Sequence, residues 1–162
     1  MALLKKVNDF LELICRKLAG FTLILFTLSI SVHVLLRAGF SYPLSWAQDA
    51  AVMLFVWMVF IGAPVALRKR SHFNIDLLNG KHPYLGKFLD VLCDAFIYVF
   101  LYVMIVNGSE FLEIAHTVYY SYLYLPQSIV VVAIPLSGLI MAFINTENLL
   151  LDLGKLHRTR KD

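Results

Sequence analysis

The sequence predicts an all-α integral membrane protein with four transmembrane helices, an N-terminal amphipathic interfacial helix, and both chain ends in the cytoplasm. Three observations predict this fold class. Of the 162 residues, 60% are hydrophobic and only 15% are charged, whereas soluble domains lie nearer ~45–50% apolar and ~25% charged. Four apolar stretches are long enough to cross a bilayer, and the basic residues fall almost entirely on one side of them.

The whole chain, residues 1–162, is expected to form a single membrane domain. Crossing ~30 Å of hydrocarbon takes ~20 apolar residues, with a range of ~17–25. The predicted spans lie at about 18–36, 50–67, 88–107 and 126–145, with an interfacial helix at 1–17 and a cytoplasmic tail at 146–162. The first apolar run is longer than the ~7–15 residues of a signal-peptide core, so we expect this span to be retained.

The distribution of basic residues predicts the orientation of the spans. Of the 14 Lys and Arg residues, Arg37 alone lies in the first or third loop, and the others lie before the first span, in the middle loop or in the tail. Short loops rich in Lys and Arg stay in the cytoplasm. We therefore predict that both termini and the middle loop are cytoplasmic.

The segment before the first span has the pattern of an amphipathic helix. Apolar residues recur at steps of three and four from Leu3 to Leu18, and basic and acidic residues occupy the positions between them. Such a helix lies in the headgroup layer and turns into the first span; the alternative is a solvated helical end. Residues 73–78 predict a second interfacial piece, and Pro83 suits the first turn of the third helix.

Ionisable residues at membrane depth are the first candidates for function. Asp94 shares a helix face with Lys87 and Asp90. Either this face meets a basic group on a partner subunit, or both acids lie near the water boundary, where the early turns of a helix favour them. His33 is either a proton relay or, as we favour, a hydrogen-bonded packing residue.

The third loop contains no Lys or Arg but is rich in tyrosine, at Tyr119, Tyr120, Tyr122 and Tyr124. Tyrosines at this density indicate an interfacial belt on the outer face, and Trp46 before the second span fits the same belt. The alternative is that the loop is a docking surface.

Several classes of function are excluded by what the sequence lacks. There is no nucleotide-binding motif, hydrolase triad or metal-ligand spacing, and Cys15 and Cys93 are expected to be apolar fillers. A net charge of +3 does not indicate nucleic-acid binding. Secondary transporters usually contain repeated halves with interrupted helices, and no such repeat is present. The residues alone therefore predict a four-helix membrane subunit, without catalytic, cofactor or metal sites, that packs against something else.

Short motifs in a fixed order suggest a family. They are Leu44-Ser45-Trp46-Ala47-Gln48-Asp49, Phe55-Val56-Trp57, Gly62, Arg68, His72-Phe73-Asn74-Ile75-Asp76-Leu77-Leu78, Leu125-Pro126 and Ile134-Pro135-Leu136. Their order on four spans resembles the small membrane subunit, the Q or DctQ-like subunit, of tripartite ATP-independent periplasmic (TRAP) transporters. That family commonly has two acids after the tryptophan, whereas this sequence has Gln48 and Asp49.

The resemblance implies a three-part importer in the bacterial inner membrane. A periplasmic binding protein captures an organic anion, such as a C4-dicarboxylate or sialic acid. A large subunit, M, carries the anion inward with sodium, and the small subunit scaffolds the large one among the membrane lipids. The resemblance implies no enzyme activity.

The resemblance also suggests roles for individual residues. Trp46 would fix depth at the outer boundary, and Asp49 would be favoured at a helix start. Arg68, His72 and Asp76 would hold the cytoplasmic loop against headgroups or the large subunit. The loop from Tyr119 to Tyr124 would be a dock for the binding protein. Ordinary helix-end and interface chemistry is the alternative for the first five residues.

Two other classes of function stay open. One is a self-sufficient small channel or exporter that works as an oligomer, motivated by the size of the chain and by Asp94 and His33. The other is a membrane enzyme or redox protein that uses Cys15 and Cys93.

Overall fold

The computed structural model describes residues 2–40, 44–69 and 83–159. They form five helices, α1 (Ala2–Phe40), α2 (Ser45–Arg68), α4 (Pro83–His116), α5 (Ser128–Val131) and α6 (Ala133–Thr159). The described residues contain no strand, only an isolated bridge between Tyr119 and Pro126. Four helical segments are long and apolar enough to cross a membrane. The predicted all-α membrane fold with four spanning helices is therefore confirmed.

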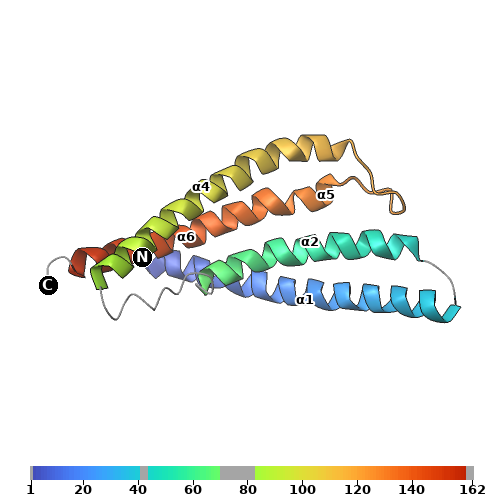
Figure 1. Ribbon diagram of the computed structural model, residues 1–162, viewed down its shortest axis with the longest axis horizontal. Helices are drawn as coiled ribbons and strands as arrows, with labels where there is room; N and C mark the ends of the chain where they lie inside the picture. Colours follow the sequence, from blue (N-terminus) through green and yellow to red (C-terminus); the bar gives the residue numbers. More distant parts are fainter. Residues whose placement is uncertain (1, 41–43, 70–82, 160–162) are drawn as a thin grey trace.

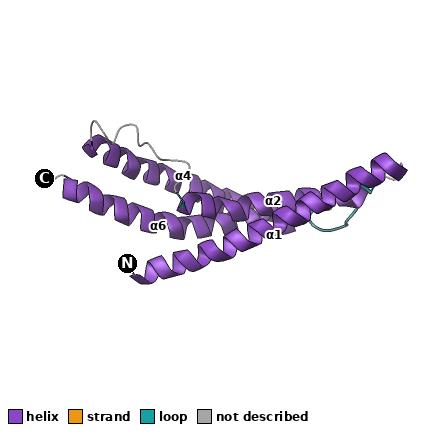
Figure 2. Cartoon of the chain, turned by 90° about the horizontal axis from the view of Figure 1, so that it is seen from below, coloured by secondary structure: helices purple, strands orange, loops and turns teal. Residues whose placement is uncertain are grey.

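The helices lie side by side in the order α1, α2, α6, α4, with α5 continuing the line of α6 (Figure 1). The closest packing is within the two sequence-adjacent pairs, α1 with α2 and α4 with α6, and α2 against α6 joins the pairs. Figure 2 shows the helices crossing at shallow angles when seen from below. Thus α2 and α6 are the inner helices of the array, and α1 and α4 form its two edges.

The best-packed part of the array lies between α4 and α6. Leu101, Met104 and Met141 form a buried cluster. Two glycines allow the backbones to approach: a Cβ on Gly138 would lie 2.9 Å from Cγ1 of Ile105, and one on Gly108 would meet the α6 residues Ile134 and Pro135. Small residues at such contacts are the usual way in which membrane helices pack closely.

Proline accounts for local features of two spans. Pro64 lies inside α2 and is fully buried. It has no N–H to donate to the Phe60 carbonyl four residues earlier, and Ser137 Oγ of α6 donates to that carbonyl at 2.6 Å. The helical stretch after Ser128 is interrupted at Val132, and α6 begins so that Pro135 falls in its first turn, where no N–H is required.

The helices extend beyond the predicted spans. The predicted turn between an interfacial helix at 1–17 and a span at 18–36 is absent, because α1 is continuous from Ala2 to Phe40. The third helix runs to His116, beyond 107, and the helix of the fourth span continues through the predicted tail to Thr159. Pro83 is the first residue of α4, as predicted.

Candidate functional site

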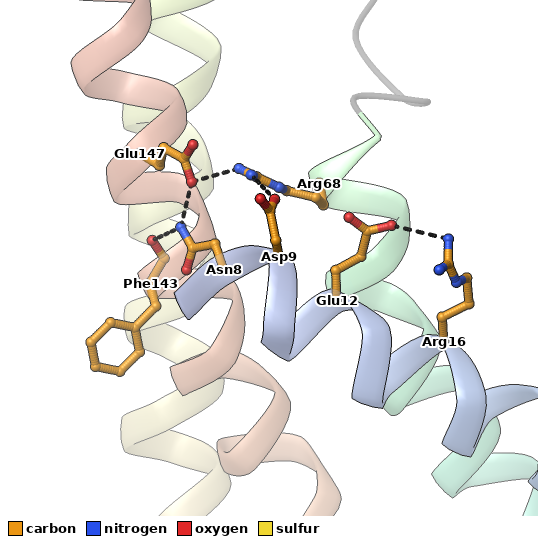
Figure 3. Close-up of polar contacts among 7 residues, drawn as sticks. All are labelled: Asn8, Asp9, Glu12, Arg16, Arg68, Phe143 and Glu147. Atoms are coloured by element: carbon orange, nitrogen blue, oxygen red, sulfur yellow. Dashed lines mark hydrogen bonds and ion pairs between the residues drawn. The ribbon is translucent and has the colours of Figure 1, made fainter. Parts of the chain in front are cut away.

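Arg68, the last residue of α2, is the centre of a polar network that joins three helices (Figure 3). Its Nη1 lies 2.6 Å from Oε2 of Glu147 on α6, and its Nη2 lies 2.6 Å from Oδ1 of Asp9 on α1. Asn8 Nδ2 donates to the same Glu147 oxygen at 2.7 Å and to the Phe143 carbonyl at 3.3 Å. The network therefore fastens α1, α2 and α6 together at one end of the array.

The two ion pairs of Arg68 differ in burial. The side chains of Arg68 and Glu147 are 12% and 10% exposed, whereas that of Asp9 is 52% exposed. Exposed pairs contribute little because water screens them, while a guanidinium and a carboxylate in a shielded position form strong charge-assisted hydrogen bonds. The Arg68–Glu147 pair is thus the main joint, and contact of Arg68 with headgroups or a large subunit stays a prediction.

A second polar layer joins α4 to α6 just inside this network. Asn145 is fully buried and donates from Nδ2 to the backbone carbonyl of Asp94 at 3.0 Å. Tyr98 Oη lies 2.7 Å from Oγ1 of Thr146. Asp94 itself is 7% exposed, and its backbone lies against α6. Its role as a contact for a partner subunit stays a prediction.

At the opposite end of the array, Asp49 holds the loop between α4 and α5. Its Oδ2 accepts a hydrogen bond from the backbone N–H of Tyr122 at 3.0 Å. Burial raises the pKa of the Tyr120 phenol above its ordinary value, and the charge of Asp49 raises this pKa further. Trp46, one turn earlier on α2, is 52% exposed. The structure therefore brings Asp49 together with the tyrosine loop, and Trp46 lies beside them on the surface.

The tyrosine loop has a defined conformation and exposed side chains. Backbone hydrogen bonds from Tyr120 N to the Leu125 carbonyl at 2.9 Å and from Gln127 N to the Val118 carbonyl at 2.8 Å close it. Tyr119, Tyr122 and Tyr124 are 57%, 59% and 80% exposed. Tyr124 adopts a φ of +51°, a left-handed conformation that is uncommon outside glycine. The loop thus presents three aromatic side chains outward from a fixed backbone.

Other predicted residues have simpler positions. His33 Nδ1 lies 3.0 Å from the carbonyl of Leu44, the residue before α2, so His33 links α1 to the start of α2. This contact agrees with the interpretation of His33 as a hydrogen-bonded packing residue. His72, Asp76 and the predicted interfacial piece at 73–78 lie outside the described residues. So does the side chain of Lys87.

Sequence reasoning missed the partners of Arg68. Asp9 was assigned only to the polar positions of the amphipathic segment at 1–17, and Glu147 fell in the predicted cytoplasmic tail at 146–162. A signal was present, because Arg68 follows the uncharged stretch 50–67, and a cation at the end of a span can pair with an acid at a neighbouring helix end. Which acid it meets depends on the order of the helices, which the sequence pattern does not contain.

The described polar residues form no metal-binding arrangement. No cluster of three or more His, Cys, Asp or Glu side chains with metal-binding geometry occurs in the part of the chain that the structure describes. Residues 50–67, 95–109 and 128–146 contain no Asp, Glu, Lys, Arg or His. The charged groups of these spans therefore lie outside the three stretches, and among them Arg68, Glu147 and Asp49 join helices or hold a loop.

Comparison with known proteins gives a consistent result. The family model of tripartite ATP-independent periplasmic transporters, DctQ component, matches residues 26–154. The chain is 29% identical over 104 residues to a TRAP transporter small permease protein of Haemophilus influenzae, covering 64% of this chain and 62% of that protein. It is 30% identical over 73 residues to the C4-dicarboxylate TRAP transporter small permease protein DctQ of Vibrio cholerae, covering 45% and 32%.

A further match is to a much longer protein. The chain is 32% identical over 77 residues to the sialic acid TRAP transporter permease protein SiaT of Haemophilus influenzae, covering 47% of this chain but only 12% of that protein. Each of these matches spans less than two thirds of the relative concerned.

Proposed function

The chain belongs to the DctQ family of tripartite ATP-independent periplasmic transporters, and from this membership we propose that it scaffolds a large membrane subunit during sodium-coupled import of an organic anion. It is a small permease subunit and a multi-pass protein of the bacterial inner membrane. One observation supports the scaffolding role: the polar contacts made by Arg68, Asn145 and Asp49 link different segments, joining helices or holding the loop between α4 and α5.

A scaffold must keep its shape while a neighbouring subunit moves. The four helices form an array in which each helix packs mainly against its neighbours in the row, and Arg68 ties three of them together at one end. A transport path would need ionisable or polar groups that meet a solute near mid-membrane depth. The uncharged stretches at 50–67, 95–109 and 128–146 offer none with a charge, which favours support over transport.

The remaining partners and the substrate follow from the relatives. One relative is named for C4-dicarboxylate and another for sialic acid, so we propose a carboxylate as the imported anion and sodium as the coupling ion. We propose that the exposed tyrosines Tyr119, Tyr122 and Tyr124 contact the periplasmic binding protein. Trp46 and Asp49 fix the depth and position of that loop. His72 and Asp76 hold the cytoplasmic loop against headgroups or the large subunit.

Liposomes test the transport role. The chain, a large TRAP subunit and a binding protein, purified together, should take up a labelled dicarboxylate or sialic acid when a sodium gradient is imposed. The chain alone should be inert. Uptake by the chain alone would replace the scaffold with the alternative of a small oligomeric channel or exporter.

Cysteine labelling tests the proposed orientation, with both termini in the cytoplasm. In a background with Cys15→Ala and Cys93→Ala, Tyr124→Cys should react with a membrane-impermeant maleimide in intact cells. Lys69→Cys, at the other end of the array and also exposed, should react only after the membrane is permeabilised. The reverse labelling pattern would show that the orientation is opposite to the one proposed.

A further inference from the structure

A groove between α1 and α2 lies at the opposite end of the array from the Arg68 network. The two helices run side by side (Figure 1). The groove has a volume of about 340 Å³, and its lining residues come from positions 26–33 of α1 and 48–55 of α2. At 1.5 Å per residue, each of these stretches is about 10 Å long. The groove is therefore short compared with the helices that form it.

The polarity of the lining changes along the groove. The residues farthest from the helix ends are Phe26 and Phe55, whose ring centroids lie 5.6 Å apart, so an aromatic pair joins the two helices at the deep end. At the other end, the mouth is lined by His33 and Gln48. Arg37 is exposed and follows His33 by one helical turn on the same face of α1. Long side chains in a helix lean back over the preceding turn, which directs the Arg37 guanidinium toward the mouth.

The mouth of the groove has a positive charge. Arg37 is the only Lys or Arg between positions 18 and 67, and no Asp or Glu lines the groove. Asp49 adjoins Gln48 in the sequence, but its Oδ2 accepts the backbone N–H of Tyr122 in the loop between α4 and α5. The electrostatics of the mouth therefore favour an anion.

The polar groups at the mouth suit a phosphate ester. The Arg37 guanidinium forms strong charge-assisted hydrogen bonds with phosphate oxygens, and the Gln48 amide is a further donor. His33 Nδ1 lies 3.0 Å from the Leu44 carbonyl. Because a carbonyl only accepts, Nδ1 is the donor in this contact, and Nε2 is left to accept a hydrogen bond from a headgroup.

The depth of the groove matches the upper part of a lipid. The mouth lies where two runs without Asp, Glu, Lys or Arg end, 18–36 on α1 and 50–67 on α2, and such ends lie near the boundary of the hydrocarbon. The groove then enters the hydrocarbon by about 10 Å of its ~30 Å thickness. A neighbouring transmembrane helix would need a groove along the whole depth, and a free phosphate would not use the apolar part.

We propose that this groove binds one anionic phospholipid from the leaflet at this end of the array. The phosphate lies against Arg37 and the Gln48 amide, and the first part of one acyl chain lies along Ile30 and Val52 down to the aromatic pair. With both termini in the cytoplasm, this is the periplasmic leaflet. The inference goes beyond the scaffolding role and does not depend on it, because all the lining residues belong to this chain.

Photolabelling of the full chain in lipid nanodiscs tests the site. The probes are phosphatidylglycerol and phosphatidylethanolamine, each with a diazirine early in one acyl chain, and peptide mass spectrometry locates the adducts. The phosphatidylglycerol probe should label 26–33 and 48–55 about fivefold more than the other probe, because one basic residue near the surface attracts an anionic lipid by ~1 kcal/mol. Equal labelling by the two probes, or adducts spread over all four spans alike, would overturn the inference.

Matched variants separate the headgroup contact from the acyl contact. Arg37→Gln should abolish the preference for phosphatidylglycerol, whereas Lys69→Gln, which removes an exposed cation at the other end of the array, should keep it. Val52→Trp fills the groove from its rim and should lose the labelling by both probes. Val59→Trp, two turns away on the same face of α2, should keep it; the two valines are 46% and 44% exposed. An unchanged preference in Arg37→Gln or unchanged labelling in Val52→Trp would contradict the proposal.

Cross-linking in cells that contain the whole complex tests which molecule occupies the groove. The photoreactive residue p-benzoylphenylalanine replaces Phe55, which is half exposed at the deep end. Irradiation should increase the mass of the chain by that of one phospholipid. An adduct with the large subunit or with a second copy of this chain would show that protein covers the groove, and the lipid site would then be ruled out.

Discussion

Removal of the Ser137 hydroxyl should weaken the packing of α6 against α2. Ser137 is 3% exposed, and its Oγ donates at 2.6 Å to the Phe60 carbonyl. That carbonyl lacks its normal helical donor because residue 64 is proline. Hydrogen bonds between membrane helices contribute ~0.6 kcal/mol on average and up to ~1.7 kcal/mol. Since this acceptor has no donor four residues on, we expect Ser137→Ala to cost about 1–1.7 kcal/mol.

A double-mutant cycle with Pro64→Ala isolates the bond. Alanine at position 64 restores an N–H that donates to the Phe60 carbonyl, so Ser137→Ala in this background should cost only about 0–0.5 kcal/mol. The coupling energy is then about 1 kcal/mol, which is within reach of a cycle between residues in contact. Unfolding of the purified chain in bicelles, followed by steric trapping, measures all four free energies. An equal cost of Ser137→Ala in both backgrounds would refute the reasoning.

Three further predictions concern the other joints of the molecule. Arg68→Ala should lower the free energy of unfolding by about 3 kcal/mol, because it leaves a buried acid unpaired, whereas Asp9→Asn should cost less than about 1 kcal/mol; denaturant titration compares them. Gly138→Ala should cost about 1–3 kcal/mol, because its Cβ would lie 2.9 Å from an α4 side chain, and thermal melting followed by circular dichroism checks this. Asp49→Asn should lower the pKa of Tyr120 toward its ordinary value, as read by NMR of labelled tyrosine.

The raised pKa of Tyr120 also predicts how stability depends on pH. A pKa raised in the folded chain means that the neutral Tyr120 phenol is favoured there, so its contribution to stability is full below about pH 10 and is lost as the pH rises through the folded pKa.

Gly154→Ala, where nothing lies within 4 Å of the new Cβ, should not destabilise the chain. A loss at Gly154 as large as that at Gly138, or an Asp9 effect equal to that of Arg68, would contradict the packing and burial arguments.

The spans could be predicted from the sequence because each has a local cause. An uncharged run such as 50–67 is long enough to cross hydrocarbon whatever surrounds it, and Pro83 marks a helix start through its own geometry. Helix order has no such local cause. The contacts of Asn8 with Glu147 and of Asp9 with Arg68 join residues 139 and 59 positions apart. The predicted turn into the first span was wrong, because α1 is continuous from Ala2 to Phe40.

In the candidate site, too, the sequence identified residues but did not predict their contacts. Asp49 was predicted only at a helix start and the tyrosine loop only as a belt or dock, so their contact through the N–H of Tyr122 required the fold. The extension of the last helix through the predicted tail carries Glu147 and its neighbours to the partners that stabilise them. Polar residues near the ends of spans are therefore better predicted as joints between helices than as solvated tails.

The three-way joint at Arg68 implies an order of events during synthesis. Asp9 precedes Arg68 by 59 residues, whereas Glu147 follows it by 79 residues. At ~5–20 residues per second, the ribosome needs about 4–16 s to add the later acid. In that interval Asp9 is the only partner of Arg68 in this network. The α1–α2 pair therefore enters the bilayer joined by the weaker ion pair, and Glu147 joins it to α6 when translation nears its end.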